Sequence, residues 1–285
     1  MQLSLFLKWG LVLYLSSSYG AGRVKTVHQP GEEARDFFAM AEESRFQKKY
    51  DQAAEQYKQA LKISPNFEEA LIGLGLVYEQ LGDSPRAIKV YESAIIVKPL
   101  FIQPRINLAH LYQNLEKDDL AFREYHEILK IDTENEESHY QLGVLNTKKK
   151  RYPTALDFFY KTLEINNNHA EAYYNIGVIY SWSGKDKEAD TTFRKALKYG
   201  LSDLPSLFFL ARYYSRFQIP EFSIYCLERV LGEQYKKVEE IERDEHFQFL
   251  KTDSTYASLL NRFRKKDAEI LPEENTLLDE DLRAP

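Results

Sequence analysis

Residues 68–101 read EEALIGLGLVYEQLGDSPRAIKVYESAIIVKPLF, and this stretch decides the fold. Apolar residues recur at helical spacing on both sides of GDSP at 82–85, a sequence typical of a turn. Each half contains a small residue, Gly75 or Ala87, which allows two helix backbones to approach closely. The stretch therefore predicts two helices packed against each other. Pro99 is expected to end the second, because proline cannot donate the helical hydrogen bond.

The same pattern returns at a fixed period along the chain. Counted from Ala34, the chain divides into six units of equal length, at residues 34–67, 68–101, 102–135, 136–169, 170–203 and 204–237. The eighth position of every unit is Gly or Ala, and the twentieth is Ala in five units and Ser in the last. Aromatic residues are expected to fill the space between the helices, at Tyr78, Tyr112 and Tyr180 and at Tyr91, Tyr125, Phe159 and Phe193. An array of this kind predicts a solenoid, in which each unit buries its apolar face against its neighbours.

This pattern resembles the tetratricopeptide repeat. The second unit carries it almost whole, in Leu71, Leu74, Gly75, Tyr78, Ala87, Tyr91, Ala94 and Pro99. The six units span most of the chain, from residue 34 to residue 237. The resemblance implies an all-α, right-handed superhelical solenoid of antiparallel helix pairs. It also implies a protein-interaction module rather than an enzyme.

The last unit is followed by two segments of different composition. Residues 238–267 hold an amphipathic pattern with Asp253 or Ser254 as a candidate helix N-cap, which predicts C-terminal capping helices. Residues 268–285 hold six acidic side chains and one basic one, a net charge of -5. That composition predicts an acidic, disordered tail.

The N-terminal segment, 1–22, has the layout of a secretory signal peptide. Lys8 precedes an apolar run at 9–15, and small residues follow to Gly22. A retained membrane anchor is the alternative, but the apolar stretch at 3–15 is shorter than the length of about 20 that a span needs. We therefore expect a cleaved signal, a linker at 23–33, and export to a periplasmic or extracellular location. Contact with a membrane is expected only if the segment stays uncleaved.

Binding is expected on the concave side, which the first helix of each unit lines in this family. Asn107, Gln141 and Asn175 occupy the same position in three consecutive units, and carboxamides can bond both groups of a peptide backbone. An extended peptide is the expected ligand, with an acidic group near Arg212. The other candidate contacts are Ile106, His110, Tyr140, Val144, Tyr174, Val178, Trp182, Arg212 and Arg216.

Several classes of chemistry are disfavoured. The net charge of -6 argues against nucleic-acid binding, which needs clustered Lys and Arg. The single cysteine, Cys226, excludes an intramolecular disulfide, and the six histidines are scattered without metal-ligand spacing. No nucleotide-binding or nucleophile motif occurs, so neither a cofactor nor a metal is expected.

The alternative function is that of a structural or assembly subunit in an envelope or secretory-pathway complex. Apolar residues exposed on the convex side would favour it.

Overall fold

The computed structural model describes residues 31–233 and 238–270, with side chains up to residue 265. Within these residues the structure contains helices and no strand. In chain order the elements are α1 (Glu32–Phe46), α2 (Tyr50–Ile63), α3 (Glu68–Gln80), α4 (Ser84–Val97), α5 (Ile102–Asn114), α6 (Asp118–Ile131), α7 (Glu136–Lys148), α8 (Tyr152–Ile165), α9 (Ala170–Trp182), α10 (Asp186–Lys198), α11 (Leu204–Arg216), α12 (Pro220–Glu233), α13 (Val238–Arg243), the 3-10 helix η2 (Glu245–Thr252) and α14 (Ser254–Ile270).

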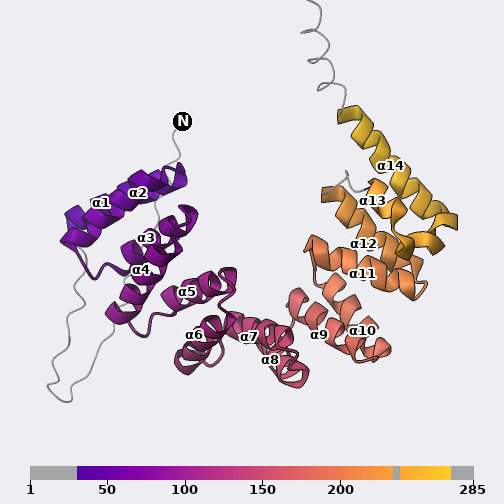
Figure 1. Cartoon of the computed structure of the whole chain (residues 1–285), viewed down its shortest axis with the longest axis horizontal. Helices are drawn as coiled ribbons and strands as arrows, with labels where there is room; N and C mark the ends of the chain where they lie inside the picture. Colours follow the sequence, from indigo (N-terminus) through magenta and orange to yellow (C-terminus); the bar gives the residue numbers. More distant parts are fainter. Residues whose placement is uncertain (1–30, 234–237, 271–285) are drawn as a thin grey trace, which may run out of the picture.

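The helices stack in pairs along an arc. Each odd-numbered helix from α1 to α11 packs against the helix that follows it, and each of the first five pairs packs against a neighbouring pair. The sixth pair packs on the fifth through aromatic side chains, such as the rings of Phe193 and Tyr213. In Figure 1, α5, α7 and α9 lie toward the inside of the arc, and α6, α8 and α10 lie toward its outside. We call the surface formed by the odd-numbered helices α1 to α11 the inner face. The expected all-α solenoid of antiparallel helix pairs is confirmed.

Close packing within a pair explains the small residue at the eighth position of each unit. A Cβ atom built on Gly75 of α3 would overlap the ring of Tyr91 on α4. The same clash would occur between Gly143 and Phe159, where the distance from the added Cβ to the ring is 2.6 Å. Ala87, at the twentieth position, is fully buried. Large aromatic rings therefore occupy the space that small residues leave free, at the dense packing of a protein interior.

Turns within the pairs share one backbone conformation. The residue two positions after the end of the first helix has a positive φ in every pair, at Lys48, Gly82, Glu116, Lys150, Gly184 and Gln218. A left-handed residue at this position ends an α-helix and lets the chain reverse. Glycine adopts it without the steric cost that a Cβ atom brings, which accounts for Gly82 and Gly184.

The C-terminal elements cover the end of the stack. Phe247 and Leu250 of η2 are fully buried, and the ring of Phe247 lies 5.9 Å from that of Phe208 on α11. Asp253 caps α14, because its Oδ1 accepts hydrogen bonds from the backbone N–H of Thr255 at 2.8 Å and Tyr256 at 3.1 Å. The predicted capping helices are thus confirmed, and they continue the apolar core of the last two pairs.

Two helix ends lie two or three residues beyond the expected limits of the repeat array and the cap. Helix α1 begins at Glu32, inside the stretch expected as linker, since Glu32 and Glu33 are favoured in a first helical turn by the helix dipole. Helix α14 continues to Ile270, past the expected start of the tail at residue 268, because Ala268 and Glu269 are good helix formers. The expected signal segment lies outside the described residues. No described helix is both long and apolar enough to span a membrane.

Candidate binding surface on the inner face

Three amide side chains lie at equivalent places on adjacent inner helices. Asn107 is on α5, Gln141 on α7 and Asn175 on α9, each at the sixth position of its unit. All three are partly exposed. The repeat period accounts for their alignment, because it places the sixth position of each unit on the same side of successive helices.

Each of these amides already has partners within the chain. The Asn107 Oδ1 accepts a hydrogen bond from Gln103 Nε2 at 2.9 Å. Asn175 Nδ2 donates to the Glu171 carbonyl oxygen at 2.8 Å and to the Tyr140 hydroxyl at 3.3 Å. A peptide that used these groups would therefore exchange existing hydrogen bonds for new ones.

A hydrogen-bonded chain of side chains joins α5 to α7. The Tyr125 hydroxyl donates to Gln113 Oε1 at 2.7 Å, and Gln113 Nε2 donates to Gln141 Oε1 at 3.1 Å. Gln141 Nε2 donates in turn to Glu137 Oε1 at 2.8 Å, which also lies 3.1 Å from His110 Nε2. The hydrogen bond from His110 lowers the pKa of Glu137.

Gln113 was missed by the sequence analysis. Its polar character and its alignment with Glu79, at the same position of the preceding unit, were the available signal. Both side chains accept a hydrogen bond from the tyrosine hydroxyl of their own pair, Tyr91 for Glu79 and Tyr125 for Gln113. The twelfth position of these two units therefore supplies the polar partner of a buried tyrosine ring. In the third unit its residue, Gln113, also supplies the link to Gln141.

Aromatic rings surround the amides in the later pairs. The Tyr140 ring stacks on His169 with centroids 4.6 Å apart, and burial raises the pKa of Tyr140 to about 12. The Tyr174 ring makes edge contact with Phe209 at 5.9 Å. Ile106 and Val144, which were also expected here, are partly exposed on α5 and α7. These rings therefore form part of the packing between pairs while still reaching the surface.

Two expected contacts have different roles. Val178 is 7% exposed and packs in the core, so it offers almost no surface to a ligand. Arg212 forms an ion pair with Asp244 of the cap, with Nη2 and Oδ2 2.7 Å apart, and lies over the Phe208 ring at 4.5 Å. The charge of Arg212 is thus neutralised within the chain, because the cap folds back onto α11. The repeat period alone could not predict this ion pair, since the cap lies outside the repeats.

The remaining expected contacts lie at the ends of their helices. Trp182, the last residue of α9, is 57% exposed, and its ring lies 5.7 Å from that of Tyr152 on α8. Arg216, the last residue of α11, is exposed, with its guanidinium 5.6 Å from the Phe217 ring centroid. Trp182 is the largest exposed apolar side chain among the described residues. It is therefore the strongest candidate anchor for an apolar ligand group.

The buried aromatic ring beneath the inner face differs between the earlier and the later pairs. Tyr57 and Tyr91 donate through their hydroxyls to Glu42 and Glu79 respectively, and Tyr125 donates to Gln113 in the third pair. In the fourth and fifth pairs, the equivalent positions hold Phe159 and Phe193, which have no hydroxyl. The buried ring at this position therefore needs a polar partner in the first three pairs and none in the fourth and fifth.

Other reactive groups in the described residues are few. No cluster of three or more metal-ligating side chains occurs among them. Cys226 is fully buried in α12, and this burial raises the pKa of its thiol to about 12. A protonated, inaccessible thiol is a poor nucleophile. Within this part of the chain, the inner face remains the main candidate for function.

Comparison with known proteins agrees with this arrangement. Family models described as TPR repeat and tetratricopeptide repeat match residues 45–82, 70–100 and 170–199. No protein among the curated sequences compared matches the chain.

Solved structures share the fold at low sequence identity. PilF from Pseudomonas aeruginosa is 18% identical with a TM-score of 0.61, and the match covers 78% of this chain and 98% of PilF. MamA from Desulfovibrio magneticus RS-1 is 15% identical with a TM-score of 0.54, covering 61% of this chain and 99% of that one. YrrB, described as a TPR protein with an unusual peptide-binding site, is 22% identical with a TM-score of 0.50, covering 62% and 91%. The chain therefore contains tetratricopeptide repeats within residues 45–100 and 170–199, and its described helices fold as a solenoid of helix pairs.

Proposed function

We propose that the inner face binds an extended segment of a partner protein, without catalysis by this chain. The alignment of Asn107, Gln141 and Asn175 on three adjacent inner helices carries the proposal. Proteins with this repeat are interaction modules, and YrrB, which shares the fold, is described as having a peptide-binding site. Fold alone does not decide function, so the argument rests on the side chains of this face.

Binding would proceed by exchange of hydrogen bonds. A peptide backbone would take the amide oxygen of Asn107 from Gln103 and the amide of Gln141 from Gln113. Because bonds are replaced rather than added, their net contribution is small, about 1 kcal/mol each. Most of the affinity would come from apolar contact with exposed rings, above all Trp182, while the amides set register and direction.

The same face indicates which charge the partner carries. Glu137 and Glu171 are partly exposed on α7 and α9, where a peptide N–H or a basic side chain could replace their present contacts with His110 and His169. Arg212 is already paired with Asp244, so the acidic ligand group expected from the sequence has no unpaired arginine there. We therefore propose a neutral or basic segment with an apolar residue near Trp182.

The proposal can be tested by affinity capture from the native compartment with a triple variant, Asn107→Ala, Gln141→Ala and Asn175→Ala. The matched control is Gln52→Ala, Asn167→Ala and Asn168→Ala, which removes three exposed amides from outside the inner helices. Partners captured by the wild type and the control, but lost from the triple variant with its helical content unchanged, would support the inner face. An identical set of partners on all three would refute it.

We also propose that the segment 1–22 acts as a cleaved export signal. The support is its basic, apolar and small-residue order together with an apolar run too short to span a bilayer. Intact-mass measurement of the protein from its native cells should show a new N-terminus close to residue 23. A full-length mass in the membrane fraction would instead support the anchor.

A second candidate function, a subunit of a larger assembly, is favoured by one surface away from the inner face. Ile96, near the end of α4, is 79% exposed, and Leu100, in the loop to α5, is 76% exposed. A contiguous patch of exposed apolar side chains is typical of an interaction site, and these two residues lie four positions apart in the chain. In this case Ile96→Ser with Leu100→Ser should abolish co-purification of the partner, while the triple amide variant keeps it.

A further inference from the structure

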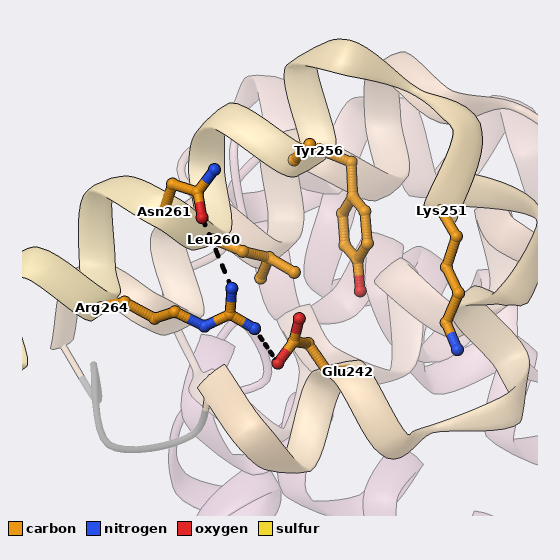
Figure 2. Close-up of a pocket in the computed structure, with 7 residues that line it drawn as sticks. Glu242, Lys251, Tyr256, Leu260, Asn261 and Arg264 are labelled. Carbon is orange, nitrogen blue, oxygen red and sulfur yellow. Dashed lines mark hydrogen bonds and ion pairs between the residues drawn. The ribbon is translucent and has the colours of Figure 1, made fainter.

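The C-terminal cap encloses a pocket that the inner face does not share. Its volume is about 580 Å³, and it lies between α13, η2 and α14. Figure 2 shows Tyr256 extending from α14 across this pocket, with Lys251 on one side of its ring and Glu242 and Arg264 on the other.

The Tyr256 hydroxyl is an unsatisfied group in this pocket. The side chain is 2% exposed, and its oxygen has no hydrogen-bond partner in the described structure. Burial raises the pKa of Tyr256 to about 12, so the hydroxyl is a neutral donor near pH 7. A buried donor without an acceptor destabilises the fold, because it has lost its hydrogen bonds to water without replacement. An acceptor is therefore missing from the pocket.

The other polar groups of the pocket also leave donors in excess. Glu242, the acidic lining residue, already forms an ion pair with Arg264. The Nη1 atom of Arg264 also donates to Asn261 Oδ1 at 3.4 Å. Lys251 is exposed and has no carboxylate within ion-pair distance among the described residues. The lining thus has one more positive than negative charge, above an apolar floor that includes Leu260. An anionic acceptor attached to an apolar group matches these features.

We propose that this pocket binds a carboxylate next to a leucine side chain, and that its occupant is the chain's own segment 277–282. That segment reads LLDEDL, so three consecutive carboxylates lie between leucines. One carboxylate accepts hydrogen bonds from the Tyr256 hydroxyl and Lys251 Nζ, and a leucine packs on Leu260. The carboxylates of this segment complement the net positive charge of the lining, and its leucines match the apolar surface of Leu260.

The chain is long enough for this contact. From Ile270 back to Tyr256, α14 rises about 1.5 Å per residue and so covers about 21 Å. The stretch from Ile270 to Leu277 can span up to about 23 Å when extended. A segment tethered this closely competes at an effective concentration in the millimolar range. An external acidic peptide would therefore meet an occupied pocket.

The test uses the full chain and a synthetic peptide of residues 274–285 with an amidated C-terminus. In one form of the chain, Asp279→Asn, Glu280→Gln and Asp281→Asn neutralise the segment and free the pocket. Fluorescence anisotropy should show that this neutral-segment chain binds the peptide about fivefold or more tightly than the wild type, in which the chain's own segment competes. Equal binding by the two chains would overturn the assignment of the occupant.

Three variants in the neutral-segment chain test the pocket itself. Tyr256→Phe and Lys251→Gln should each weaken peptide binding about tenfold or more, because each removes a donor to a charged acceptor. Lys265→Gln, which changes an exposed lysine of α14 outside the pocket lining, should leave binding unchanged. Binding that survives both pocket variants would refute the site.

A stability measurement distinguishes a binding role of Tyr256 from a structural one. In the neutral-segment chain, Tyr256→Phe removes an unpartnered hydroxyl and should leave the thermal midpoint unchanged or raise it. In the wild-type chain the same change breaks the contact with the segment and should lower the midpoint. A decrease of equal size in both chains would show that the hydroxyl acts only within the folded cap.

Discussion

At the scale of single residues, the fold depends on pairs of one small and one aromatic side chain. The site of a missing Cβ on Gly75 is filled by the fully buried ring of Tyr91, and Gly177 and Phe193 repeat the arrangement in the fifth pair. A methyl group added at such a glycine has to displace a ring that is packed on all sides. Glycine is therefore kept inside these helices for packing, despite its low helix propensity.

We expect Gly75→Ala to destabilise the protein by about 1–3 kcal/mol, the usual range for overpacking. Gly232→Ala in α12 is the matched control. Apart from its chain neighbours and the backbone of its own helix, nothing lies within 4 Å of its added Cβ, so this change near the end of α12 should be neutral or slightly stabilising. Urea unfolding of both variants measures the difference. If both substitutions moved the midpoint in the same direction, packing would not be the reason for Gly75.

A second prediction at this scale concerns the single cysteine. Burial raises the pKa of Cys226 to about 12, so its thiol is protonated and shielded at pH 8. A thiol reagent should therefore label the native protein very slowly, and label it fully once the chain is unfolded in guanidinium chloride. Fast labelling of the native protein would indicate that α12 opens readily.

At the scale of elements, polar side chains supplement apolar packing between neighbouring inner helices. The link between α5 and α7 includes the 3.1 Å contact of His110 with Glu137, and the hydrogen bond lowers the pKa of that carboxyl below its usual 4.5. A carboxylate with a lowered pKa in the folded state stabilises the fold above its unfolded pKa. This contribution is lost as the pH falls through the folded value.

His110→Ala should therefore raise the pKa of Glu137 toward its usual value. It should also reduce the loss of stability that the wild type shows below about pH 4.5. Carboxyl titration by NMR measures the pKa, and unfolding at several pH values measures the stability. His126→Ala is the control, since its ring contacts Phe122 and Phe158 rather than Glu137. An unchanged pKa for Glu137 in His110→Ala would show that the contact does not persist in solution.

At the scale of the whole molecule, each pair contacts only its neighbours, so stability is distributed locally along the stack. The cap forms the last contact of this series. Its Phe247 packs against Phe208 of α11, and its apolar residues extend the core of the final two pairs. Loss of the cap should therefore affect nearby pairs more than distant ones.

Phe247→Ala should cost about 3–5 kcal/mol, as expected for a fully buried phenylalanine. Hydrogen exchange should then accelerate in α11, α12 and the cap, whereas amides of α3 and α4 should keep their wild-type rates. Phe46→Ala, which changes a side chain that is 86% exposed at the other end of the stack, is the control and should have little effect on either region. Uniform acceleration along the chain would show that the stack unfolds as one unit.

Much of the fold could be predicted from the sequence because its determinants are local and repeated. Gly75 and Ala87 mark the close approach of two helices, and Asp253 marks the start of α14. The inner-face amides could be aligned for the same reason, since the period alone places Asn107 and Gln141 together. Their partners could not be predicted, because Gln113 and Glu137 reach them from other positions on the helices.

The sequence by itself determined the repeat period, the pairing of helices and the positions of the turns, because each depends on side chains close together in the chain. Only the tertiary structure decided which groups remain available. It pairs Arg212 with Asp244 of the distant cap, buries Val178, and encloses Tyr256 without an acceptor. The physical reason is that exposure and hydrogen-bond partners depend on which distant segments pack together, and the repeat pattern ends where the cap begins.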